Sequence, residues 1–339
     1  MPAPAATPLT VSVVLPLYNA EQMIEATLAP LLAMLSRGEV SEIVVVDDGS
    51  TDSSVERVNR HPGVKVLRGG VRAGPAAARN LGAREATGDY LWFVDSDVVV
   101  AENAAQVLHA SIESDAPQAV IGSYDDAPAA RNFLSQYKNL VHSYYHHRGR
   151  REASTFWTGC GAVQRQLFLS IGGFDAERYP YPSIEDIELG YRIRGAGGRI
   201  VLEPALLGKH LKEWRLKNLL HTEIFRRAIP WSLLMLERKE LTDDLNVGRS
   251  ERVLAVLAAA WMLALGAALA GWAPAWLPLV LVAAALVGNR HLVAFFAARR
   301  GVAFATGAFL YHQFYYVYSS LSFAAAVTQH LIATPRRPR

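Results

Sequence analysis

Short apolar runs alternate with helical patterns through the N-terminal part of the chain. The runs are rich in valine and bounded by polar or turn residues, which is typical of buried strands; they lie at 11–15, 43–46, 64–67 and 90–94. Between them the spacing predicts helices, with apolar residues Ile24, Leu28, Leu31 and Leu35 on one face of the first. Strands that alternate with helices predict a mostly parallel sheet in an α/β fold.

Acidic or turn residues follow several of these runs. Because ligands of such sheets bind beyond the carboxyl ends of the strands, these residues are expected along one rim. They are Pro16 with Tyr18, Asp47 with Asp48, and Asp95, Ser96 and Asp97. Carboxylate oxygens suit Mg²⁺ or Mn²⁺, so the rim predicts a cation site; taken alone, residues 95–97 fit a solvated strand end equally well.

Composition narrows the class of protein. Hydrophobic residues make up 51% of the 339 positions, with an excess after Arg252, and the net charge of +3 is too small to favour nucleic acid. The single Cys160 excludes an intrachain disulfide framework and fits a reducing compartment. Residues 1–9 predict a disordered lead without the features of a signal peptide. A Rossmann glycine fingerprint and a Walker A sequence are both missing.

The C-terminal third predicts association with a membrane. Apolar stretches at 253–271, 275–288 and 303–333 predict three spans, with two as the alternative. Basic residues before the first and third stretches favour a cytoplasmic side, whereas the terminal RRPR argues the other way if the spans are three. Residues 131–148 and 212–236 combine aromatic and basic residues at helical spacing, which fits the membrane interface; for 131–148, packing on the catalytic core is the alternative.

Five stretches in order carry a resemblance to a known family. They are LPLYNAE, VVVDDGSTDSS, GPAAARNLGAREATGDYLWFVDSD, TFWTGCGAVQR and PSIEDIELGYRIR, between residues 15 and 194. Together they resemble family 2 glycosyltransferases of the GT-A fold, over roughly residues 11–210. The resemblance implies an α/β fold with a Rossmann-like, mostly parallel sheet, followed here by an α-helical transmembrane region.

The resemblance also implies a donor site for a nucleotide sugar such as a UDP- or GDP-sugar. Asp97 and Asp95 would form the metal site for Mg²⁺ or Mn²⁺, with His210 as a further ligand; for His210, a neutral histidine in a core or loop is the alternative. Asp47 and Asp48 would hold the base and ribose. The other residues implied at this site are Pro16, Tyr18, Arg79 and Ser96. For Arg79, an exposed helix charge is the alternative.

On the acceptor side, the resemblance implies Asp186 as the general base of an inverting transfer, with Glu185 beside it. The alternative is that both acids merely favour the first turn of a helix. Trp157, Gly159, Cys160 and Gly161 would line the sugar pocket. Cys160 is interpreted as a small buried thiol, because no base motif accompanies it.

The expected organisation follows from these features. A lead at 1–9 precedes a GT-A domain at 10–210, interfacial helices at 211–248 and two or three transmembrane helices at 249–339. The expected function is metal-dependent transfer of a sugar to a lipid or polyprenyl-phosphate acceptor at the inner membrane, with the catalytic domain cytoplasmic and the bilayer as a partner. The alternatives are a processive polysaccharide synthase and a non-catalytic nucleotide-sugar-binding protein.

Overall fold

A computed structural model describes residues 9–70, 72–239 and 248–333. The chain divides into two compact units, the first made of residues 1–130 and 150–212 and the second of residues 131–149 and 213–339. Residues 1–8 of the disordered lead predicted at 1–9, and residues 240–247 of the interfacial segment predicted at 211–248, lie outside the described residues.

The first unit is built on a nine-stranded sheet of order β3-β2-β1-β4-β8-β6-β9-β5, with β7 paired to β9. The strands are β1 Val11–Leu17, β2 Glu42–Asp47, β3 Val64–Arg68, β4 Tyr90–Val94, β5 Val98–Val100, β6 Ala119–Tyr124, β7 Glu152–Ala153, β8 Cys160–Gln164 and β9 Ile200–His210. The four strands expected from the apolar runs are β1 to β4, and they pair in parallel as predicted. Strands β8 and β5 run antiparallel to β4 and β9, so the sheet is mixed.

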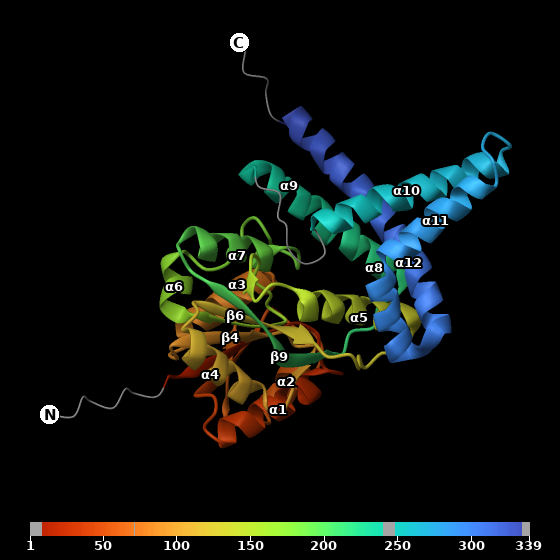
Figure 1. Ribbon diagram of the computed structural model, residues 1–339. Coiled ribbons are helices and arrows are strands. Elements are labelled where there is room, and N and C mark those ends of the chain that lie inside the picture. Colours follow the sequence, from red (N-terminus) through yellow and green to blue (C-terminus); the bar gives the residue numbers. More distant parts are fainter. Residues whose placement is uncertain (1–8, 71, 240–247, 334–339) are drawn as a thin grey trace, which may run out of the picture. The chain divides into compact units, whose positions relative to one another are not determined.

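Helices cover both faces of this sheet (Figure 1). One face carries α1 Ile24–Ser36, α2 Ser54–Val58 and α4 Ala104–Asp115, and the other carries α3 Pro75–Glu85, α6 Arg165–Ser170 and α7 Glu185–Gly195. The first face is a continuous apolar core, because Ile24, Leu28 and Leu31 of α1 are fully buried against β1 and β2. The helices thereby leave the carboxyl ends of β1, β2 and β4 at one edge of the unit.

Strand β9 is the longest strand of the sheet. It runs from Ile200 through Pro204 to His210, with a register irregularity against β6 between Ile121 and Ser123. The long strand matters for the site, because its last residues pair with β5, which begins directly after Asp97.

The second unit is helical. Its helices are α5 Phe133–Arg148, α8 Leu216–His221, the π-helix η1 Thr222–Ala228, α9 Ile229–Arg238, α10 Arg249–Leu269, α11 Trp276–Gly288 and α12 Arg290–Ala333. Tyr137 and Leu140 of α5 pack with Leu292 and Phe296 of α12. The sequence placed residues 131–149 within the expected GT-A domain of residues 10–210. In the structure they belong to the second unit, because the apolar face of α5 is buried by α12.

Among the described residues, two helices are long and apolar enough to cross a membrane, α10 and α12. The second expected span, 275–288, corresponds to α11, whose 13 residues extend only about 20 Å and fall short of a hydrocarbon core of about 30 Å. Helix α12 runs from Arg290 rather than 303 and is kinked at Gly301, where φ is 82°. The alternative of two long apolar helices therefore describes this unit better than three.

Candidate active site

The turn between β4 and β5 carries the predicted metal-binding acids. Strand β5 pairs antiparallel with β9, and the pairing of Val98 with His210 brings the end of β9 to this turn. As a result, Nε2 of His210 lies 3.5 Å from Oδ2 of Asp97. Burial alone would raise the pKa of Asp97, but the hydrogen bond and charge of His210, together with Lys212, lower it below its ordinary value. The Asp97 carboxylate is thus kept ionised.

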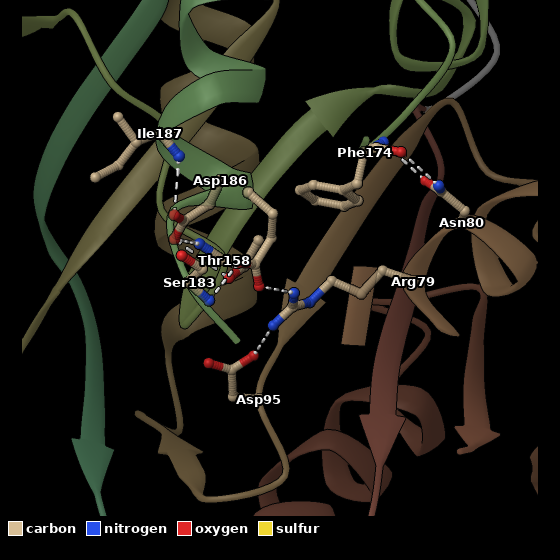
Figure 2. Close-up of polar contacts among 9 residues, drawn as sticks. Arg79, Asn80, Asp95, Thr158, Phe174, Ser183, Asp186 and Ile187 are labelled. Atoms are coloured by element: carbon tan, nitrogen blue, oxygen red, sulfur yellow. Dashed lines mark hydrogen bonds and ion pairs between the residues drawn. The ribbon is translucent and has the colours of Figure 1, made fainter. Parts of the chain in front are cut away.

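Arg79 of α3 joins this turn to α7. Its Nη2 lies 2.6 Å from Oδ1 of Asp95, and its Nη1 lies 3.1 Å from Oε1 of Glu185. The side chain is 4% exposed, which excludes the alternative of a surface charge. Burial opposes the charge of Arg79, yet Asp95 and Glu185 outweigh it and raise the pKa above its ordinary value. Arg79 is therefore a buried cation held between two carboxylates, as Figure 2 shows.

The two acids at the start of α7 differ in their surroundings. Glu185 is buried, and while Arg79 takes one of its oxygens, the other accepts a hydrogen bond of 2.8 Å from the Ser183 amide. Asp186 is partly exposed, and its Oδ2 lies 3.3 Å from the amide nitrogen and 3.4 Å from Oγ1 of Thr158. Both acids were predicted as catalytic residues; Glu185 is the one committed to internal contacts, and Asp186 is the one turned toward Thr158 (Figure 2).

The predicted sugar pocket is shaped by glycines against Trp157. A Cβ atom at Gly159 would lie 2.4 Å from the Trp157 ring, and one at Gly161 would lie 2.2 Å from the Trp157 carbonyl oxygen. Cys160 is fully buried between them, and burial raises the pKa of its thiol to about 12. An un-ionised thiol is a poor nucleophile, so this structure agrees with the interpretation of Cys160 as a packing residue.

An aromatic residue that the sequence analysis did not single out connects this pocket to His210. The ring of Tyr124 stacks on His210 with a centroid distance of 4.7 Å and meets Trp157 edge-on at 4.8 Å. Tyr124 is the last residue of β6, which pairs in parallel with β9. Its position at the carboxyl end of a strand is the signal that could have identified it from the sequence.

The residues expected around the nucleotide lie at the ends of β1 and β2, where Leu17 pairs with Asp47 and Pro16 with Val46. Asp47 accepts a hydrogen bond of 2.9 Å from the Ser50 amide. Both oxygens of Asp48 accept amide hydrogen bonds, from Ala73 at 2.7 Å and Gly74 at 2.9 Å. Asp48 thus fixes the loop that precedes α3.

Two further residues complete this side of the site. Arg72, on the loop that Asp48 fixes, places its guanidinium carbon 4.4 Å from the ring centroid of Tyr18. Arg72 was not among the predicted site residues, and no local sequence pattern marks it. The carbonyl oxygen of Ser96 accepts a hydrogen bond of 3.0 Å from Thr27 of α1, which fixes the turn that carries Asp95 and Asp97.

The side chains of this site can be compared with the ligands that a divalent cation needs. Within the described ranges, no group of three or more His, Cys, Asp or Glu side chains converges on one point. Asp97 and His210 nevertheless converge, and a carboxylate with an imidazole is a donor pair that fits Mn²⁺. Asp95 shares one oxygen, Oδ1, with Arg79, so it is a weaker candidate ligand. A cation here would be held by Asp97 and His210, with ligand oxygens or water at its other positions.

Comparisons with known proteins agree with this geometry. The mannosyltransferase PcManGT from Pyrobaculum calidifontis, solved in complex with GDP-Man and Mn²⁺, superposes with a TM-score of 0.53 at 22% identity, covering 96% of this chain and 89% of that one. GalNAc-T7, solved with UDP, GalNAc and Mn²⁺, superposes with a TM-score of 0.50 at 22% identity, covering 62% of this chain and 45% of that one. The fold of the first unit is thus that of the GT-A glycosyltransferases, in which a Rossmann-like sheet carries the site.

Residues 12–172 match the family described as Glycosyl transferase family 2. An uncharacterized glycosyltransferase of Haemophilus influenzae is 38% identical over 98 residues, which are 27% of this chain and 38% of that protein. The validoxylamine A glucosyltransferase of Streptomyces hygroscopicus subsp. limoneus is 29% identical over 231 residues, 58% of this chain and 51% of that protein. The chain thus spans about half or less of the length of these relatives. Residues 12–172, somewhat less than half of the chain, therefore resemble a family 2 glycosyltransferase domain.

Proposed function

We propose that this enzyme transfers a sugar, with inversion, from a nucleoside diphosphate sugar to a lipid or polyprenyl-phosphate acceptor at a membrane. The observation that carries the proposal is the double ion pair of Arg79, which links the Asp95–Asp97 turn to the helix of Asp186. A single buried side chain thereby links the turn that carries Asp97, proposed for the cation, to the helix that carries Asp186, proposed for the proton.

The donor would lie along the rim formed by the ends of β1, β2 and β4. Tyr18 and Pro16 would flank the base, and Asp47 would accept hydrogen bonds from the nucleoside through oxygens not used by Ser50. Asp97 and His210 would hold Mn²⁺ or Mg²⁺, which supplies a Lewis acid for the diphosphate leaving group. The lowered pKa of Asp97 suits this task, because an ionised carboxylate is the form that binds a cation.

Asp186 would act as the general base. With a hydroxyl acceptor, its oxygen forms a bond to the anomeric carbon while its proton passes to the Asp186 carboxylate, and the bond from that carbon to the diphosphate oxygen breaks with its electron pair leaving on the diphosphate. A phosphate acceptor attacks already ionised and gives up no proton. Thr158 orients the carboxylate by donating to Oδ2, and the Ile187 amide donates to Oδ1 at 2.8 Å. Glu185 would position Asp186 through Arg79 rather than take the proton itself.

The second unit supports a membrane-associated acceptor. Only 11% of the most apolar 18-residue stretch of α10 is buried within the chain. Val256 and Leu263 on this helix are 71% and 74% exposed. Exposed apolar surface of this extent is costly in water and favourable in hydrocarbon. We therefore place the helices in the cell membrane with the first unit on its cytoplasmic face, where the acceptor lipid and the donor can meet.

The test uses the full chain in detergent. A thermal-shift screen of UDP- and GDP-sugars with Mg²⁺ or Mn²⁺ should identify one donor, and nucleoside diphosphate should then be released in the presence of lipid extract. Asp186→Asn should abolish turnover and retain donor binding, whereas Asp97→Asn should weaken metal-dependent donor binding. Tight binding of a nucleotide sugar without any transfer would contradict the proposal and favour a binding protein, and a long polymer product would favour a synthase.

A further inference from the structure

A short turn after α6 is held from two sides. Asn80 of α3 donates from Nδ2 to the Phe174 carbonyl oxygen at 2.8 Å and accepts at Oδ1 from the Phe174 amide at 2.8 Å, as Figure 2 shows. From the other side, Nη1 of Arg192 on α7 donates to the Ile171 carbonyl oxygen at 2.8 Å. The turn at 171–174 thus connects α3, which carries Arg79, to α7, which carries Glu185 and Asp186.

From this arrangement we infer that Asn80 is a positioning residue for the proposed transfer. It sets the separation of α3 and α7 and thereby the ion pair of Arg79 with Glu185. The inference rests on the proposed function, because its effect is defined on the transfer reaction. Asn80 is adjacent in sequence to Arg79, so any displacement of its backbone is passed directly to the buried guanidinium.

The turn is shaped for this contact. Gly172 and Gly173 have φ values of +85° and +68°, which favour glycine over other residues. A Cβ atom at Gly173 would lie 2.4 Å from Oδ1 of Asn80. Only a residue without a side chain therefore allows the carboxamide to reach both the amide and the carbonyl of Phe174.

The ring of Phe174 links the turn at 171–174 to Arg79 in the candidate active site. The guanidinium carbon of Arg79 lies 5.6 Å from the ring centroid, and Nε of Arg79 is buried without a hydrogen-bond partner among the described residues. The ring also packs against Phe93 of β4 at 5.2 Å, close to Asp95 on the same strand end. The orientation of the guanidinium thus depends on a ring face as well as on its two carboxylate partners.

Packing alone does not fix the turn. A cavity of about 460 Å³ lies beside it, lined by Asn80, by residues 172–177 and by Glu188 and Arg192. Because the turn can relax into this space, the two hydrogen bonds of Asn80 are what hold its backbone against α3. Loss of these bonds should therefore loosen the turn without emptying the aromatic core around Phe93.

The experiment compares Asn80→Ala and Asn80→Asp with Glu177→Gln in the full chain. Asn80→Asp keeps the acceptor for the Phe174 amide but places a carboxylate oxygen against the Phe174 carbonyl. Both variants should lower kcat by about 10- to 100-fold. The donor KM and the calorimetric donor affinity should stay within about threefold of wild type, because Asn80 is assigned no contact with substrate. Glu177 lines the same cavity and is exposed, so Glu177→Gln should retain wild-type kcat.

A merely structural role would lower the yield and melting temperature and leave the kcat of the folded fraction unchanged, which would overturn the inference. If Asn80→Ala does not fold, Gly173→Ala approaches the same contact from the turn and should give the same fall in kcat with donor affinity retained. If instead the wild-type chain transfers no sugar, the proposed function fails. If the wild type is active and the Asn80 variants keep the wild-type kcat, the positioning role is wrong and the proposed function stands.

Discussion

Nη1 of Arg79 lies 3.1 Å from Oε1 of Glu185, although the two residues are 106 positions apart in the chain. Both side chains are buried, with exposures of 4% and 5%. A buried charge without a partner is costly, so each of these residues requires the other. The pair therefore fixes the first turn of α7, which contains Asp186, against the helix that carries Arg79.

We expect Arg79→Lys to lower kcat by about 100-fold or more. A lysine ammonium is a single point charge and cannot present two parallel donors to Asp95 and Glu185 at once. The rate of nucleoside diphosphate release at saturating donor measures the effect. Arg84→Lys, an exposed arginine on the same helix, is the control and should keep the wild-type rate. Equal rates for the two variants would show that the double ion pair does not support catalysis.

Gly161→Ala should lower the stability of the first unit by about 1–3 kcal/mol. The new Cβ atom would clash with the Trp157 carbonyl oxygen, so the backbone at residue 157 or 161 must shift. Gly195→Ala is the matched control, since a Cβ atom at the end of α7 meets nothing within 4 Å. Loss of hydrogen-exchange protection at β8 measures the difference. Identical protection in both variants would mean that residue 161 tolerates a side chain.

Glu42 predicts a pH dependence of stability. One carboxylate oxygen accepts hydrogen bonds from Oγ of Ser12 at 2.7 Å and from the amide and hydroxyl of Thr87 at 2.6 and 2.7 Å. Burial would raise the pKa of Glu42, but these hydrogen bonds, with a smaller contribution from Lys65, lower it. The stabilisation is therefore present above the unfolded pKa, about 4.3, and is lost as pH falls through the folded pKa.

Glu42→Gln should accordingly cost about 1–2 kcal/mol of protection at β1 and β2 near pH 7, and the difference from wild type should shrink below pH 4. Native-state hydrogen exchange at several pH values measures it. Glu56→Gln, on a side chain that is 71% exposed, should change protection by less than about 0.5 kcal/mol. A Glu42→Gln deficit that stayed constant down to acid pH would contradict the lowered pKa.

Cys160 should resist alkylation in the folded protein. Burial raises the pKa of its thiol to about 12, so at pH 7.5 almost no thiolate is present and the sulfur is also inaccessible. Mass spectrometry after iodoacetamide treatment should find the native chain unmodified and the urea-unfolded chain fully modified. Cys160→Ala should retain transferase activity, because the thiol takes no part in the proposed reaction. Rapid labelling of native protein would contradict the buried assignment.

Leu263→Glu should reduce recovery of the chain in membranes. This position on α10 is 74% exposed, and an acidic residue at the centre of a span costs about 2.5–3.5 kcal/mol in hydrocarbon, whereas on a water-facing helix it would be harmless. Sucrose-gradient fractionation measures the partition, and Leu263→Ala is the control. If Leu263→Glu instead gave a stable protein without detergent, α10 would not lie in a bilayer.

Much of the fold could be predicted because its signals are local. The valine-rich runs and their helical intervals determined β1 to β4 and the parallel pairing, since a strand that is buried on both faces must be apolar throughout. Five ordered motifs indicated the family. Local signals did not predict that α5 packs against α12, because its burial against Phe296 depends on residues far along the chain.

The sequence by itself therefore indicated the fold class, the rim of the sheet that bears the acids, and the apolar character of the C-terminal helices. Tertiary structure decided what each acid contacts. Asp97 meets His210 because β5 pairs with β9, and Glu185 is paired with Arg79 because α3 brings that side chain to α7. The physical reason is that burial, and the contacts it enforces between distant residues, distinguish carboxylates that are chemically identical in the sequence.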